Sequence, residues 1–202
     1  SALRSYAELV CKGNVDLDQE TTGYLNALMD RVEAVGDRFD VLQDFSRGER
    51  GMASRETICL NQLLDDFYRS NLPDMELSGL SFRLNLPKEN ILIKGRQDQL
   101  RIVLENLCYN AIFFTPPDGT ITLELAQEEG LGVITVRDTG AGIAPQDLPH
   151  VFERGFTHRP DNSGDGLGLY IVRSIALEHG GSVEAVSQPG KGSEFILRLP
   201  VL

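Results

Sequence analysis

The sequence predicts an α/β sandwich, with a mixed and mostly antiparallel sheet covered by helices on one face, preceded by an α-helical hairpin. Residues 1–50 show only helical periodicity, whereas residues 51–202 combine strand-like alternation with amphipathic helices. The strands come mostly in hairpins, which excludes the regular strand–helix alternation of a doubly wound parallel sheet. The polar segment GERGMASRE marks the boundary between a domain of residues 1–50 and one of residues 51–202.

The first domain is predicted to be two helices that need a partner. Leu3, Ala7 and Val10 form one helical stripe, which the segment KGNVDLD interrupts. The second helix has seam positions at alternating spacings of three and four, namely Leu25, Leu28, Val32, Val35, Phe39, Leu42 and Ser46. Two helices cannot bury such a seam, so a second copy that completes a four-helix bundle is the most economical partner. Packing of the hairpin on its own globular domain is the alternative.

The second domain begins with segments that alternate between strand and helix. Residues 57–71 are predicted to be a short strand that leads into a helix capped by Asn61. Residues 80–87 and 90–95 alternate as strands. Residues 97–115 form a long amphipathic helix, which the turn PPDG closes.

The second half of this domain is predicted to contain two hairpins and two helices. The hairpins span residues 120–138 and 182–200, and the helices span residues 144–156 and 166–181. The first hairpin turns near Glu129-Gly130, and Gly180 ends the second helix. This order of elements completes the predicted sandwich.

The composition argues against several classes of protein. With 41% hydrophobic residues, the chain of 202 residues can bury a core. A formal net charge of −11 argues against a nucleic-acid partner, because binding a polyanion requires a basic surface. The apolar runs are too short for a membrane span or a signal peptide, so no membrane contact is expected from this chain. Cys11, Cys59 and Cys108 lack metal-type spacing, which indicates reduced thiols in a cytoplasmic setting.

Three glycines at alternate positions, Gly164, Gly166 and Gly168, precede an apolar helical segment. They do not follow a strand, as the glycines of a Rossmann fingerprint do, and no lysine follows them, as in a P-loop. By themselves they are as consistent with a flexible turn that caps a helix as with a phosphate-binding loop.

Two motifs upstream of these glycines favour a nucleotide site. Asp138 ends a predicted strand and precedes Gly140 and Gly142, which would let the backbone approach a flat ligand. Asn106 and Asn110 lie four residues apart and therefore share one helix face. An amide oxygen suits Mg²⁺, which itself bridges phosphates. Three separate elements that would converge on a nucleotide favour such a site far more than any one of them alone.

These motifs resemble those of the sensor histidine kinases, whose catalytic domain has the Bergerat ATP-binding fold. ENLCYNA resembles the N box, DTGAGI the first glycine box, VFERGFT the phenylalanine box and GDGLGLYIV the second glycine box. The final GKGSEFILRLP is similar to the closing strands of the family, so the resemblance covers about residues 56–202. It implies that the chain binds ATP together with Mg²⁺.

The resemblance also implies a role for each motif. Asp138 would accept a hydrogen bond from the adenine amino group, while Gly140 and Gly142 leave room for the base. Asn110 would coordinate Mg²⁺, and Asn106 would act as a catalytic residue close to the phosphates. The other nucleotide-binding residues that the resemblance implies are Ile143, Gly164, Gly166, Leu167, Gly168, Leu169 and Ser193. The three glycines would belong to a lid over the phosphates, which would face the N-terminus of the next helix.

Asn106 and Phe113 set this chain apart from related proteins. In the related ATPases the position of Asn106 is a glutamate that activates water, and asparagine cannot act as a base. The site is therefore expected to hold ATP for transfer rather than to hydrolyse it. The family commonly has Lys or Arg where this chain has Phe113. Arg154 and Arg159 are the candidates to neutralise the phosphates as catalytic residues, with solvated surface arginines as the alternative.

A phosphate acceptor is absent from the predicted hairpin. The three histidines, His150, His158 and His179, all lie outside residues 1–50, where the family places its phosphorylated histidine. The N-terminal 25 residues resemble the dimerisation hairpin from a point shortly after that histidine. The chain is therefore expected to begin just too late and to bind ATP without autophosphorylation.

In the parent protein, the γ-phosphate would pass to a hairpin histidine and then to an aspartate of a response regulator receiver domain. The expected assembly is a cytoplasmic homodimer that forms through the hairpin. Two alternatives stay open: a non-catalytic nucleotide-binding pseudokinase or scaffold, and a serine-directed kinase on the same fold.

Overall fold

The fold is taken from a computed structural model, which describes residues 55–157 and 166–202. The chain divides into two compact units, 1–52 and 53–202, and the described residues all belong to the second. The helical hairpin predicted for residues 1–50 lies outside the described residues and stays a prediction.

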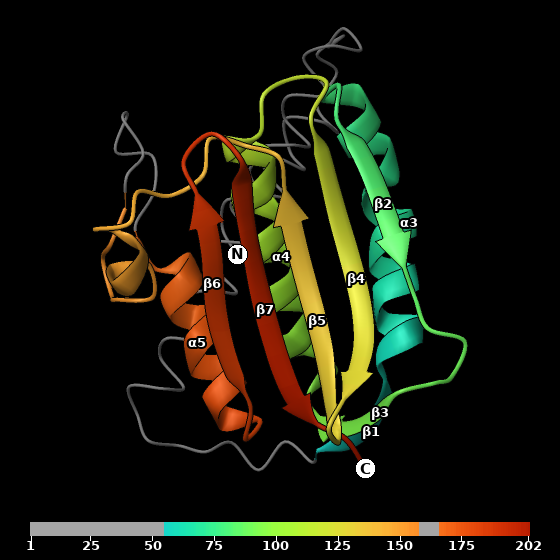
Figure 1. Cartoon of the computed structure of the whole chain (residues 1–202). Helices are drawn as coiled ribbons and strands as arrows, with labels where there is room; N and C mark the ends of the chain where they lie inside the picture. The colour runs from blue at the N-terminus through green and yellow to red at the C-terminus, as the bar shows by residue number, and fades with distance from the viewer. Residues whose placement is uncertain (1–54, 158–165) are drawn as a thin grey trace, which may run out of the picture. The chain divides into compact units, whose positions relative to one another are not determined.

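A five-stranded sheet forms one layer of the second unit (Figure 1). Its strands run in the spatial order β2 (Ser81–Asn85), β4 (Thr120–Glu128), β5 (Leu131–Asp138), β7 (Gly192–Pro200) and β6 (Ser182–Gln188). Strands β2 and β4 are parallel, whereas the other three neighbouring pairs are antiparallel. The predicted mixed, mostly antiparallel sheet is therefore confirmed.

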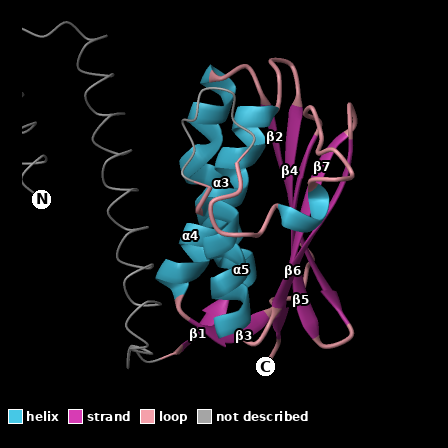
Figure 2. Ribbon diagram, turned by 90° about the vertical axis from the view of Figure 1, so that its left-hand side faces the viewer, coloured by secondary structure: helices cyan, strands magenta, loops and turns pink. Residues whose placement is uncertain are grey.

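Three helices cover one face of this sheet, as Figure 2 shows. They are α3 (Leu60–Leu77), α4 (Gln97–Phe114) and α5 (Gly168–Glu178). Among the described residues, no helix lies on the other face of the sheet (Figure 2). None of the described helices combines the length and the apolar character that crossing a membrane requires.

The core lies between the helices and the covered face of the sheet. Ile121, Leu123 and Leu125 alternate along β4 and are buried, because side chains two residues apart point to the same face of a strand. Leu104 and Leu107 of α4 are also buried, in agreement with the apolar face predicted for this helix. Burial of each such side chain contributes about 1.5–3 kcal/mol to the free energy of unfolding.

A second, two-stranded sheet pairs β1 (Glu56–Cys59) with β3 (Leu92–Gly95) in antiparallel fashion. The predicted capping role of Asn61 is wrong, because α3 already begins at Leu60. The Asn61 side chain instead accepts a hydrogen bond from the Ile91 backbone N–H (2.9 Å). Its Nδ2 donates to the carbonyls of Pro87 and Glu89, both at 3.1 Å. Asn61 therefore fixes the loop that leads into β3.

The helix predicted for residues 144–156 is largely absent. Only a single 3₁₀ turn, η1 (Leu148–His150), forms within it. Pro145 and Pro149 lack the backbone N–H that a helix needs, and Gly155 adopts a left-handed φ of 83°. The segment therefore follows a series of turns.

Two predicted turns are confirmed. Strands β4 and β5 are joined by Glu129 and Gly130, with φ of 48° and 80°, as a tight hairpin turn of this twist requires. Helix α5 ends where Gly180 adopts a φ of 74°, and the Gly181 N–H donates to the Ala176 carbonyl at 2.9 Å. This five-residue return is the Schellman arrangement for a helix C-terminus.

Candidate functional site

The predicted site residues that the structure describes gather at one end of the domain. Strand β5 ends there at Asp138, and α4 presents its C-terminal half (upper part of Figure 1). The turn between β6 and β7 lies at the same end (Figure 1). Helix α5 begins lower, beside Asn106 in the middle of α4. Segments far apart in the sequence therefore meet, as the three-element prediction requires.

Asp138 is the buried carboxylate of this site, with 4% of its surface exposed. Its Oδ1 accepts hydrogen bonds from the backbone N–H groups of Gly140 (2.8 Å) and Ser193 (3.2 Å). Its Oδ2 makes no hydrogen bond to the residues that the structure describes. Burial raises the pKa of the Asp138 carboxyl, and the two backbone hydrogen bonds partly oppose that rise. One carboxylate oxygen thus remains available to a hydrogen-bond donor on a ligand.

The loop after Asp138 packs tightly on protein backbone. A Cβ on Gly140 would lie 2.3 Å from the Phe114 carbonyl oxygen, and one on Gly142 would lie 2.2 Å from that of Gln188. Gly142 also has a left-handed φ of 70°. These two glycines therefore let the loop lie against the end of α4 and the β6–β7 hairpin. The contact with a base that the resemblance implied for them stays a prediction.

Asn106 lies at the interface between α4 and α5. Only 2% of its surface is exposed, and its Nδ2 donates to the Ile102 carbonyl at 2.7 Å. A Cβ on Gly168 would lie 2.8 Å from Asn106 Oδ1, so the first residue of α5 must be small. Asn110 lies one turn further along α4 and is partly exposed. The asparagine face of α4 is therefore turned toward the start of α5.

Two glycines bring together the ends of the segment that precedes α5. The Gly155 N–H donates to the Gly166 carbonyl at 3.0 Å. Gly166 has a φ of 66°, and a Cβ there would lie 2.4 Å from the Gly155 carbonyl carbon. Residues Gly164 and Arg159 lie outside the described part of the chain.

Helix α5 begins at Gly168, after Leu167, whose aliphatic side chain has no atom that could accept a capping hydrogen bond. The first N–H groups of a helix have no partner within the helix and attract anions. Leu167 and Leu169 are both partly buried at this terminus. The terminus lies beside Asn106, so an anion bound there would also lie near the asparagine face of α4.

Helix α4 and the phenylalanine-box segment offer few cationic side chains that could contact phosphates. Phe113 is 40% exposed and packs edge-on against Phe114, with the ring centroids 4.9 Å apart. Arg154 is exposed and makes no hydrogen bond or ion pair with the described residues. Phe152 packs edge-on against Phe195 of β7 at 6.3 Å, so it attaches this segment to the sheet.

Ser187 was not among the predicted site residues. It lies opposite Ser193 in the β6–β7 hairpin, and the two hydroxyl oxygens are 3.0 Å apart. Ser187 Oγ accepts a hydrogen bond from the Ile143 N–H at 2.8 Å. The alternation of the hairpin could have placed Ser187 on the same face as Ser193, but the sequence does not reveal the contact with Ile143.

The described residues fit a magnesium ion that is held mainly by a nucleotide. Within the described ranges, no three His, Cys, Asp or Glu side chains are arranged to hold a metal. Magnesium commonly takes only one or two protein ligands and fills its other positions with phosphate and water. The neutral amide oxygen of the partly exposed Asn110 suits this role.

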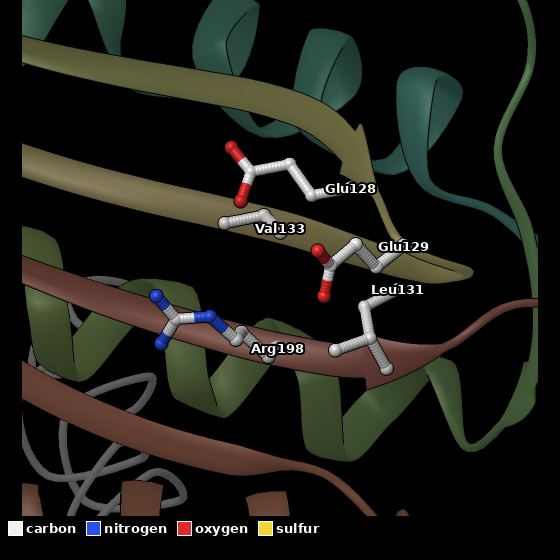
Figure 3. A pocket seen from close by; sticks show the side chains of 5 residues that line it. All are labelled: Glu128, Glu129, Leu131, Val133 and Arg198. Carbon is white, nitrogen blue, oxygen red and sulfur yellow. The ribbon is translucent and has the colours of Figure 1, made fainter.

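A surface hollow lies away from these residues. It has a volume of about 500 Å³ and is lined by Glu128, Glu129, Leu131, Val133 and Arg198 (Figure 3). The hollow is at the far end of β5 from Asp138, on the sheet face that has no described helix (Figures 1 and 3). Arg198 is already paired with Glu184 at 2.8 Å. The hollow is therefore separate from the predicted site.

Comparison with known proteins gives consistent matches. Residues 95–202 match the family described as histidine kinase-, DNA gyrase B- and HSP90-like ATPases. The sensor histidine kinase RppB of Synechocystis sp. is 32% identical over 195 residues, which cover 92% of this chain and 43% of that protein. The sensor protein SrrB of Staphylococcus aureus is 31% identical over 209 residues, which cover 99% of this chain and 35% of SrrB.

A solved structure agrees with these matches. The mycobacterial sensor histidine kinase MprB has a TM-score of 0.62 and 29% identity, and the alignment covers 73% of this chain and 97% of that structure. The chain spans less than half the length of RppB and of SrrB.

Proposed function

Because the chain belongs to the family of histidine kinase-, DNA gyrase B- and HSP90-like ATPases, we propose that its second unit binds ATP with Mg²⁺ for transfer to a histidine. The resemblance to sensor histidine kinases and the Bergerat fold that it implied are confirmed by the family match and by the MprB structure. The observation that most supports ATP binding is the convergence of the Asp138 carboxylate, the Asn106–Asn110 face and the start of α5.

Asp138 selects the base in this proposal. Its Oδ2 accepts a hydrogen bond from the adenine amino group, while Oδ1 stays bound to the backbone of Gly140 and Ser193. A carboxylate held in this way in a buried site is rigid, so little freedom is lost when the base binds. Gly140, Gly142 and Ile143 form the loop beside the base.

The start of α5 and the end of α4 bind the phosphates. The N–H groups of Gly168 and Leu169 in the first turn of α5 donate to phosphate oxygens, and the helix dipole favours the negative charge of the phosphates. Asn110 contributes an amide oxygen to Mg²⁺, which neutralises part of the phosphate charge when it is bound. Arg154, and Arg159 with Gly164 from the neighbouring segment, are proposed to complete the phosphate contacts.

Asn106 favours transfer of the γ-phosphoryl group over hydrolysis of ATP. Its amide cannot take a proton from water, so it positions the phosphates without activating a nucleophile. The γ-phosphoryl group then leaves the β–γ bridging oxygen and bonds to an imidazole nitrogen, with ADP as the leaving group. Residues 1–50 contain no histidine, so the acceptor in this proposal is a histidine that a dimerisation hairpin supplies.

The parent protein in this proposal is a homodimer that forms through its hairpin. Its phosphohistidine passes the phosphoryl group to an aspartate of a response regulator receiver domain on the cytoplasmic side. The relative RppB is a sensor histidine kinase, which supports a histidine acceptor over a serine acceptor.

Phe113 supports a second candidate function, that of a nucleotide-binding scaffold. An aromatic ring at this position leaves α4 without a cation beside Asn110. Binding of the diphosphate part would then persist while transfer of the γ-phosphoryl group is slow or absent.

Two measurements on the 202-residue chain test these functions. Calorimetric titration with Mg·ADP is expected to show one site per chain, and no heat of binding would contradict both candidates. Incubation with Mg·ATP and a hairpin that contains its histidine, supplied in trans, is expected to produce phosphohistidine on the hairpin. Binding of ATP without any phosphohistidine would favour the scaffold.

A further inference from the structure

The Ser187 hydroxyl group of the β6–β7 hairpin contacts the base-binding loop at Ile143. We propose that Ser187 is a specificity-determining positioning residue, which directs the Ser193 hydroxyl proton away from the ligand so that the site presents only hydrogen-bond acceptors beside Asp138. The ligand selected is a purine with an amino group at position 6. This inference rests on the proposed nucleotide site and deepens it.

The hydrogen bonds of Ser187 leave it no proton for Ser193. A serine hydroxyl has one proton to donate and two lone pairs to accept with. The Ile143 backbone N–H can only donate, so at 2.8 Å it occupies one lone pair of Ser187 Oγ. The Gly192 carbonyl can only accept, so at 2.8 Å it takes the Ser187 proton. The remaining contact, 3.0 Å to Ser193 Oγ, must therefore be donated by Ser193.

This direction determines what Ser193 offers to a ligand. Ser193 is 8% exposed, and once its proton points to Ser187 its oxygen retains only lone pairs. Its backbone N–H binds Asp138 Oδ1 at 3.2 Å, so Ser193 and Asp138 are direct neighbours. Asp138 Oδ2 is also an acceptor. An amino group is complementary to both oxygens, whereas a carbonyl at the same position of the base would meet lone pairs.

The base-binding loop is also held by contacts that do not involve Ser187, so Ser187 is not its only support. The Ala141 N–H donates to the Phe114 carbonyl at 3.1 Å, and the Gly190 N–H donates to the Ala141 carbonyl at 2.7 Å. The close approach of Gly142 to Gln188 adds a packing contact. In Ser187→Ala these attachments remain, but the Ile143 N–H loses this acceptor, the Gly192 carbonyl loses the Ser187 proton, and the Ser193 hydroxyl no longer donates to Ser187 and can turn. A carbonyl on the base can then receive the Ser193 proton.

The test compares ADP with IDP, which has a carbonyl in place of the 6-amino group. Dissociation constants of both are measured by calorimetry with Mg²⁺ for the full chain, Ser187→Ala and Ser174→Ala. Ser174 is the matched control, because its hydroxyl donates only to the Tyr170 carbonyl of its own helix at 2.9 Å. The wild-type chain is expected to prefer ADP by about a hundredfold, and Ser187→Ala to reduce this ratio roughly tenfold. Ser174→Ala should keep the wild-type ratio.

The ratio of the IDP and ADP dissociation constants distinguishes selection of the base from a general loosening of the base-binding loop. If Ser187→Ala weakens both nucleotides by the same factor, or weakens neither, the inference is overturned. Ser193→Ala removes the acceptor itself and is expected to reduce the ratio as well, so it serves if Ser187→Ala does not fold. An unchanged ratio in Ser193→Ala would also overturn the inference. If the wild-type chain binds neither ADP nor IDP, the proposed function is contradicted as well. If the wild-type chain binds ADP but the variants keep its ratio of IDP to ADP dissociation constants, this inference alone is contradicted.

Discussion

The two ends of the domain use buried polar residues in opposite ways. At the end where β5 finishes, Asp138 is buried with one oxygen that has no hydrogen bond to the described residues. At the other end, His179 is equally buried, but both of its ring nitrogens are bound: Nδ1 to the Ile175 carbonyl at 2.9 Å, and Nε2 to the Arg96 N–H at 3.0 Å. Asn61 likewise uses both ends of its amide.

This contrast separates residues that hold the fold from Asp138, which we propose binds the ligand. A buried polar group that is fully bonded stabilises the folded state, whereas an unbonded one lowers stability unless a ligand completes it. His179 joins the C-terminus of α5 to the start of α4, so it couples two helices of the covering layer. Substitutions at the two ends should therefore separate stability from binding.

The largest effect is expected from Asp138→Asn. The new amide keeps an oxygen for the Gly140 and Ser193 N–H groups but presents NH₂ instead of Oδ2 to the base. The affinity for Mg·ADP should fall about a thousandfold, as measured by calorimetry.

The same variant should not lower the stability of the ligand-free chain. Burial raises the pKa of Asp138 in the folded state, so ionisation of the carboxyl opposes folding. Stability of the wild-type chain is therefore lost as pH rises from the ordinary carboxyl pKa through the raised value, and Asp138→Asn removes this loss. Thermal unfolding at pH 7 should give an equal or higher Tm for the variant, and a clearly lower Tm would contradict the contrast.

His179→Ala should have the opposite effects: it should lower the stability of the chain and leave nucleotide binding unchanged. It leaves the Arg96 N–H without its partner and opens a cavity against Gly95, whose Cβ position lies 2.6 Å from the imidazole. The free energy of unfolding should fall by about 2–4 kcal/mol, as measured in urea. His150→Ala is the control, because His150 is exposed and its side-chain contacts, with Glu153 and the Phe156 ring, lie in a segment of turns away from α4 and α5. The folded fraction of His179→Ala should bind Mg·ADP normally, and a loss of affinity would show that the two ends are coupled.

Gly142→Ala tests whether close backbone packing supports the site. The added methyl group would lie 2.2 Å from the Gln188 carbonyl, in addition to the strain of a φ of 70°. Gly190→Ala is matched to it, because Gly190 has a φ of 75° but no atom near its Cβ position. We expect Gly142→Ala to weaken Mg·ADP binding roughly tenfold more than Gly190→Ala does. Equal affinities in the two variants would show that the loop tolerates displacement.

The smallest effect is expected on the sheet face without a described helix. Arg198→Ala removes a partly exposed ion pair with Glu184 and one wall of the hollow in Figure 3. Unfolding in urea should change by less than about 1 kcal/mol, and the affinity for Mg·ADP should not change. A marked loss of nucleotide binding would indicate that the hollow belongs to the site.

Local patterns in the sequence were sufficient for most of the architecture. The alternation in residues 120–138, with Glu129 and Gly130 at the turn, predicted the central hairpin because both signals are local. The order of the glycine and asparagine motifs also predicted which segments meet, as at Asn106 and Gly168.

Features that depend on distant contacts could not be predicted. Asn61 has the composition of a helix cap, but its partners lie 26–30 residues away in the loop before β3. Gly140 and Gly142 signal a close approach without indicating that the neighbour is protein backbone. The role of Ser187 depends on the register of β6 and β7, which places it opposite Ser193, and no local pattern indicates it.

The location of the nucleotide is the central claim, and amide NMR on the ¹⁵N-labelled chain tests it most directly. On addition of Mg·ATP, we expect the amide signals of Gly140 and Gly168 to shift, because they lie beside Asp138 and Asn106. The signals of Gly95 and Gly130, at the opposite end of the domain, should stay in place. Shifts at Gly95 or Gly130, with Gly140 and Gly168 unchanged, would contradict the account.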